Sequence, residues 1–261
     1  MLKALKMVCP GRQGEMHGRL PKSVLQSDRI VAASVRDPWD WYVSTWAYGC
    51  DGEGILFDRL AKPRKILGHG YRRSLRGGIA NFLRDMARPR RPWREAYADS
   101  SSPELFGRWL RLMMDPDRAG EVREDYGRSS LSQFAGLYSY LYCRLLHRTI
   151  DHLYDGTIQD IETLMKADER LNVVDHMMKT EELTEGILEL LGRAKVETDE
   201  TFRRRIAEMD RTNPSSRKRD TTYYYDRSAE QLIMERDALI IRKYGYRPPS
   251  LSSELTGPEE R

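Results

Sequence analysis

The sequence has few cysteines and no long apolar run, and each shortage excludes a class of protein. Its three cysteines are scattered and share no paired spacing with histidines, so they cannot form a disulfide framework or, on their own, a four-ligand zinc site. The longest apolar runs fall far short of the roughly 20 residues that a membrane helix requires. Residues 1–16 contain no extended apolar segment followed by a small-residue cleavage site. We therefore expect a cytoplasmic protein without a membrane contact or a bound metal.

The length and composition of the chain are typical of one medium-sized domain. The chain has 261 residues, of which 39% are hydrophobic and 32% charged, enough for a single real core. We expect one domain over residues 1–248. Residues 249–261 show no core-forming pattern, which is typical of a disordered tail.

Positive charge is unevenly distributed. The formal net charge is only +4, but residues 62–94 contain eleven Lys or Arg and a single acid, Asp85. This stretch belongs to a predicted basic helical insertion at about 62–125. Such a stretch should attract an anionic substrate, cofactor or nucleic acid, or it forms a solvated face and loop.

Hydrophobic periodicity and capping residues predict a helix-dominated chain with two strands. The strands are predicted at 29–35 and 171–178, and the helices at 38–48, from 79, and at 103–114, 131–150, 157–169, 180–192 and 228–244. Because helical connections separate the two strands, parallel pairing is expected. The predicted fold class is therefore α/β with a small parallel sheet.

The first strand is predicted to end on Arg36 and to lead directly into a helix. Asp37 is expected to cap this helix, and Pro38 suits its first position. Ser44 follows Asp37 by seven residues, about 20° short of two full turns, so it lies on the same side as the strand-to-helix junction. An arginine fork with a hydroxyl donor beyond the end of a strand suits a phosphate. In the alternative interpretation, Arg36 pairs with Asp37 or Asp40 and the position of Ser44 is incidental.

The segment VRDPWDWYVS, residues 35–44, resembles the second signature of the sulfotransferase superfamily, Arg-Asp/Asn-Pro with a serine eight residues after the arginine. The resemblance implies that Arg36 and Ser44 hold the 3′-phosphate of 3′-phosphoadenosine 5′-phosphosulfate (PAPS), the co-substrate. Three more segments are similar to the family: MHGRLPKSV with His17, MMKTEELTEGILELL with Lys179, Glu181 and Leu183, and residues 211–248, which look like the closing region of bacterial carbohydrate-type sulfotransferases.

The resemblance also implies a fold and a reaction. The fold would be the P-loop-NTPase-like sulfotransferase fold, and the reaction would move the sulfuryl group from PAPS to a hydroxyl or amine of a carbohydrate or small metabolite. His17 is the candidate base, since a histidine with an ordinary pKa near 6.5 can accept a proton at neutral pH. Asn213, Ser215 and Arg217 lie in a basic turn whose donors could reach the 3′-phosphate, although a plain basic linker would have the same composition.

One family element has no counterpart before Arg36. The phosphosulfate loop of the family is a glycine-containing turn between a strand and a helix, whereas LPKSVL at 20–25 offers Lys22 and Ser23 without a glycine or a preceding strand. We therefore expect a chain that is incomplete at its N-terminus or has lost half of its co-substrate site. Two alternatives stay open: a non-catalytic relative that only binds PAPS or 3′-phosphoadenosine 5′-phosphate (PAP), and a nucleic-acid-binding helical protein that uses residues 62–94.

Overall fold

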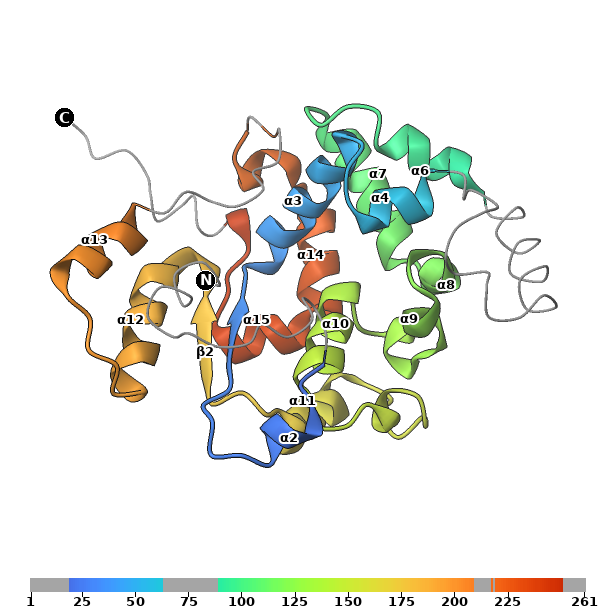
Figure 1. The fold of residues 1–261 in the computed structure, drawn as a ribbon. Coiled ribbons are helices and arrows are strands. Elements are labelled where there is room, and N and C mark those ends of the chain that lie inside the picture. The colour runs from blue at the N-terminus through green and yellow to red at the C-terminus, as the bar shows by residue number, and fades with distance from the viewer. Residues whose placement is uncertain (1–18, 63–88, 209–216, 218, 251–261) are drawn as a thin grey trace.

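The computed structural model describes residues 19–62, 89–208, 217 and 219–250 (Figure 1). Within these ranges the chain is rich in helices and contains one two-stranded parallel sheet. The predicted combination of many helices with a small parallel sheet is confirmed.

The strands are β1 (Ala32–Val35) and β2 (His176–Lys179). The α-helices are α2 (Lys22–Leu25), α3 (Pro38–Cys50), α4 (Ile55–Leu60), α6 (Arg90–Ala96), α7 (Pro103–Met114), α8 (Ala119–Val122), α9 (Glu124–Arg128), α10 (Leu137–Leu146), α11 (Ile161–Leu171), α12 (Leu183–Arg193), α13 (Glu200–Ala207), α14 (Arg227–Arg236) and α15 (Ala238–Tyr244). Short 3₁₀ helices are η2 (Pro116–Arg118), η3 (Ser130–Gln133), η4 (Asp151–Leu153), η5 (Thr180–Glu182) and η6 (Thr221–Tyr224).

Both strands begin later than predicted. Ala32 pairs with His176 and Val35 with Lys179 in parallel register. The second strand starts at 176 because Val173 N donates to Leu146 O at the end of α10 instead of joining the ladder. Parallel pairing places the carboxyl ends of both strands at the same edge of the sheet.

The core surrounds α3, which packs against α7 and α14 (Figure 1). Trp39, Tyr42 and Trp46 are fully buried, and a helix that is apolar on nearly every side belongs inside a protein. Trp46 meets Phe106 of α7 edge to face, with ring centroids 5.4 Å apart. The helix predicted over 38–48 is confirmed and continues to Cys50. Ser102 caps α7, with its Oγ accepting from Leu105 N.

A smaller apolar cluster covers the other side of the sheet. Met178 of β2 packs with Ile187 and Leu191 of α12 and with Phe202 of α13. Gly186 permits this close approach, since a Cβ atom there would lie 2.7 Å from the Met178 side chain. The sheet is therefore enclosed between the main core and the α12–α13 unit.

Two predicted helices were wrong in extent. The helix predicted over 131–150 is two elements, because η3 ends at Gln133 and α10 begins only after Gly136. The helix predicted over 228–244 is also two, α14 and α15, which meet at the buried Asp237. Gly245 ends α15 in the left-handed conformation, φ 67°, as a C-terminal glycine commonly does.

The start of the predicted tail, residues 249–250, is attached to the domain. Ser250 donates from its backbone N to Glu230 Oε1 at 2.8 Å and from its hydroxyl to Oε2 at 2.7 Å, while residues 251–261 lie outside the described ranges. No helix in the described part of the chain is long and apolar enough to cross a membrane.

Candidate functional site

The junction between β1 and α3 fixes the position of Arg36. Asp37 caps α3 by accepting from Asp40 N at 2.9 Å, and Pro38 occupies the first helical position, both as predicted. The Tyr138 hydroxyl of α10 accepts from Arg36 N at 2.8 Å and donates to Arg36 O at 3.1 Å. The backbone of Arg36 is therefore held from the side by α10 while its side chain extends along α3.

The side chain of Arg36 contacts two of the three residues that the sequence offered as partners, Ser44 and Asp40. Its Nη2 donates to Ser44 Oγ at 2.8 Å, and its Nε donates to Asp40 Oδ2 at 2.6 Å. Arg36 and Ser44 thus face each other, as the helical spacing predicts. The ion pair with Asp40, which was the competing interpretation, is present at the same time.

Two residues from the C-terminal part of the chain complete the group. Arg217 Nη2 donates to Asp40 Oδ1 at 2.5 Å, and the Thr221 hydroxyl at the start of η6 donates to the same oxygen at 2.9 Å. Arg217 Nη1 in turn donates to Thr221 Oγ1 at 3.3 Å. We call Arg36, Asp40, Ser44, Arg217 and Thr221 the Asp40 cluster.

The Asp40 cluster carries an excess of positive charge. Burial opposes ionisation of Asp40, but the charges of Arg36 and Arg217 outweigh it and hold the pKa of the carboxyl group below its ordinary value. Asp40 is therefore ionised at neutral pH. Two guanidinium groups around one carboxylate leave a formal charge of +1 in the cluster.

The cluster is open to solvent and has donors to spare. The side chains of Arg36 and Asp40 are 32% and 20% exposed. Within the described ranges, Arg36 Nη1 and the hydroxyl hydrogen of Ser44 have no hydrogen-bond partner. Guanidinium and hydroxyl donors beside a net positive charge are the groups that bind a phosphate or sulfate.

The structure brings together three of the six predicted site residues: Arg36, Ser44 and Arg217. His17, Asn213 and Ser215 lie outside the described residues. Lys22 begins the four-residue helix α2, and no strand precedes that helix in the part of the chain that the structure describes.

Sequence reasoning missed Thr221 and assigned Asp40 only to an alternative. Asp40 was identifiable because it follows Arg36 by four residues on a helix. Thr221 gave no local signal, since its contact with Asp40 spans 181 positions. The two tyrosines that follow in η6 differ in exposure: Tyr224 is buried in the core, whereas Tyr223 is 47% exposed.

Three further polar residues, Glu181, His147 and His176, make hydrogen bonds that stabilise the fold. Glu181, in the segment MMKTEELTEGILELL, accepts through Oε1 from Asp37 N at 2.8 Å and so supports the backbone at the start of α3. His147 and His176 are buried, and each is hydrogen-bonded within the chain. Among the described residues, no group of His, Cys, Asp and Glu is arranged to hold a metal ion.

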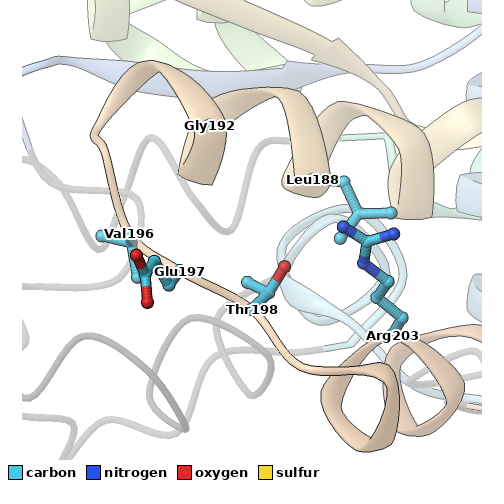
Figure 2. A pocket seen from close by; sticks show the side chains of 6 residues that line it. All are labelled: Leu188, Gly192, Val196, Glu197, Thr198 and Arg203. Atoms are coloured by element: carbon cyan, nitrogen blue, oxygen red, sulfur yellow. The ribbon is translucent and has the colours of Figure 1, made fainter.

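A cavity of about 580 Å³ lies elsewhere, between α12 and α13. Figure 2 shows the Arg203 side chain of α13 extending toward Leu188 of α12, with Thr198 between the two helices. The lining residues are Leu188, Gly192, Val196, Glu197, Thr198 and Arg203. Since no predicted site residue lines this cavity, the Asp40 cluster remains the candidate site.

Comparison of the chain with models of protein families, with curated proteins and with solved structures gives no match.

Proposed function

We propose that the Asp40 cluster binds the 3′-phosphate of PAPS, or of its product PAP, in a chain of the P-loop-like sulfotransferase type. The observation that carries the proposal is the 2.8 Å contact between Arg36 Nη2 and Ser44 Oγ. The family resemblance assigns the 3′-phosphate to these same two residues. Their convergence in a partly exposed cluster with a formal charge of +1 supports that assignment.

The role of Asp40 in this proposal is to hold the two arginines in place. It accepts from Arg36 through one oxygen and from Arg217 through the other. Side chains that are already ordered lose less conformational entropy when a ligand arrives. The phosphate would then take the donors that Asp40 leaves over, chiefly Arg36 Nη1 and the Ser44 hydroxyl.

The proposed reaction is an in-line transfer of the sulfuryl group. A lone pair of the acceptor oxygen or nitrogen forms the new bond to sulfur as the bond between sulfur and the bridging phosphate oxygen breaks, and PAP leaves. The acceptor gives up its proton to a base, for which His17 is the candidate. The Asp40 cluster contributes by fixing the nucleotide so that the reacting atoms align.

The first test is the melting temperature with PAP. PAP at about 100 times its Kd should stabilise the wild-type chain by about 2.7 kcal/mol. Adenosine 5′-monophosphate, which lacks the 3′-phosphate, should have a much smaller effect. Arg36→Ala should abolish the PAP effect, because both a charge and a forked donor are lost. Ser44→Ala should weaken PAP binding by about tenfold or more, since it removes a hydrogen bond to a charged group.

Arg242→Ala is the matched control, since it removes an arginine from an exposed ion pair, with Glu162, outside the Asp40 cluster. It should leave the PAP effect unchanged. A wild-type chain that PAP does not stabilise would contradict the proposal, and so would an Arg36→Ala variant that PAP stabilises as much as the wild type. Transfer of labelled sulfate from PAPS to a panel of hydroxyl and amine acceptors then separates an enzyme from a non-catalytic binding protein.

A further inference from the structure

A second carboxyl group lies immediately behind the Asp40 cluster. Asp37 is adjacent to Arg36 in the chain, and its Oδ1 accepts from the backbone N of Asp40 at 2.9 Å. Its own backbone N donates to Glu181 Oε1 at 2.8 Å. Asp37 is therefore linked to Asp40 on one side and to Glu181 on the other, and the charges of both act on its carboxyl group.

Charged and titratable groups from several elements lie near Asp37 at this edge of the sheet. Asp40 on α3, Glu181 in η5, Tyr225 after η6 and Tyr246 after α15 interact with Asp37 itself. The groups that contact these residues or Arg36 are Tyr138 on α10, Arg217 before η6 and Lys179 at the end of β2. The charge of Asp37 opposes the formal charge of +1 that Arg36, Arg217 and Asp40 leave in the Asp40 cluster. Neutralising Asp37 would remove that opposition.

We infer that the carboxyl group of Asp37 sets the affinity of the Asp40 cluster for a phosphate-bearing ligand, which binds more tightly when this group is neutral. The inference rests on the proposed function. A negative charge on the residue adjacent to Arg36, hydrogen-bonded to Asp40 N, repels an incoming phosphate, and partial burial of Asp37 weakens the screening of that repulsion by water.

The carboxyl group of Asp37 changes its charge near neutral pH, so the repulsion of a phosphate depends on pH. Burial raises the pKa of Asp37 to about 6, and the charges of Glu181 and Asp40 add to that increase, against the hydrogen bond from Asp40 N. By linkage, a ligand that binds the neutral form better must raise the pKa of Asp37 further and take up a proton on binding. PAP affinity should therefore increase as the pH falls from 8 toward 6.

Asp37→Asn tests the inference with little change in shape. Asparagine caps helices as well as aspartate does, and it can accept from Asp40 N, but it carries no charge. At pH 8 the variant should bind PAP about tenfold more tightly than the wild type, as expected for one charge removed at short range. At pH 5 the two should agree within about twofold, since Asp37 is then mostly neutral in the wild type.

Isothermal titration calorimetry in two buffers of different ionisation enthalpy gives a second measurement. At pH 7 the wild type should take up more protons on binding PAP than Asp37→Asn does, and titration of the ligand's own phosphates contributes equally to both. Glu181→Gln keeps an acceptor for Asp37 N and should move the midpoint of the pH dependence to lower pH.

Asp160→Asn is the control, because Asp160 caps α11 through Thr163 N and contacts no residue of the Asp40 cluster in the described ranges. It should bind PAP like the wild type at every pH. An Asp37→Asn variant that binds PAP no better than the wild type at pH 8, or takes up as many protons, overturns the inference alone. A wild-type chain that binds no PAP at any pH overturns the proposed function and this inference with it.

Discussion

Two carboxylates in this molecule are bonded in nearly the same way. Asp40 lies between the basic side chains Arg36 and Arg217 and also accepts from Thr221. Asp168 of α11 has a corresponding set of partners: His147 Nε2 lies 3.0 Å from Oδ1, Asn172 Nδ2 donates to Oδ1 at 2.9 Å, and Lys243 Nζ donates to Oδ2 at 2.5 Å. We call Asp168 and these three partners the Asp168 cluster.

The two clusters differ in burial and in what they leave unused. The side chains of Asp168 and His147 are 2% and 0% exposed, against 20% and 32% for Asp40 and Arg36. Burial opposes ionisation of Asp168, but the hydrogen bonds from its three partners outweigh it and lower the pKa of the carboxyl group. The Asp168 cluster joins α10, α11 and α15 around a buried carboxylate and a buried histidine, with Lys243, 33% exposed, at its outer side, which is the arrangement of a structural anchor. The Asp40 cluster keeps donors that face solvent, which a binding site needs.

The sharpest test of this difference is Asp168→Ala. The substitution leaves two basic groups buried or half-buried without their partner, and loss of one member of a buried pair costs about 3 to 5 kcal/mol. Chemical denaturation should show a decrease of that size in the free energy of unfolding. Glu162→Ala, on the same helix in an exposed pair with Arg242, should cost less than about 1 kcal/mol. A loss as small as that for Asp168→Ala would remove the distinction between anchor and site.

The pH dependence of stability tests His152, which contacts the Asp168 cluster through His147. His152 Nε2 lies 2.9 Å from His147 Nδ1. Burial, and then the neighbouring His147, lowers the pKa of His152 to about 4. The unfolded chain therefore binds this proton at higher pH than the folded chain, and the stability that His152 contributes is lost as the pH falls from about 6.5 to 4.

His152→Gln should remove that part of the pH dependence. Because the ring is partly exposed and screened by water, we expect the difference between wild type and variant to change by only about 1 kcal/mol between pH 7.5 and 4.5. The raised pKa of Asp37 acts in the opposite direction over part of this range, but it is common to both proteins and cancels in the difference. A difference that stays constant with pH would show that His152 titrates alike in the folded and unfolded chain.

The two clusters also differ in how much of them the sequence predicts. The Arg36, Asp40 and Ser44 part depends on one strand end and two turns of one helix, so the capping residues and helical spacing were sufficient to place it. Arg217 joins Asp40 across 177 positions, and no local pattern encodes the packing that brings them together. The Asp168 cluster was missed altogether, since its four members come from three helices and the segments that follow them.

Asp237 shows the same limit within the fold. The periodicity of residues 228–244 predicts a single helix, and nothing in that segment indicates an interruption. Asp237 accepts from the Tyr42 hydroxyl at 2.7 Å and from Ser139 N at 2.8 Å. These bonds connect it to α3 and α10 inside the core, where an unpaired polar group would be costly. Tertiary hydrogen bonding therefore outweighed helix propensity at this residue.

The smallest expected effects on stability come from substituting the neutral donors of the two clusters, Thr221 and Asn172. Thr221→Val removes a partly exposed hydroxyl that bonds Asp40, so it should cost only about 0.5 to 1 kcal/mol of stability and weaken PAP binding a few-fold. Thr221→Ser keeps the hydroxyl and should do neither. Asn172→Ala, beside the buried Asp168, should cost about 1 to 3 kcal/mol and leave PAP binding unchanged. Chemical denaturation measures the stability of the three variants, and calorimetry measures their PAP affinity. Equal stability losses for Thr221→Val and Asn172→Ala would mean that the difference in burial does not distinguish the roles of Asp40 and Asp168.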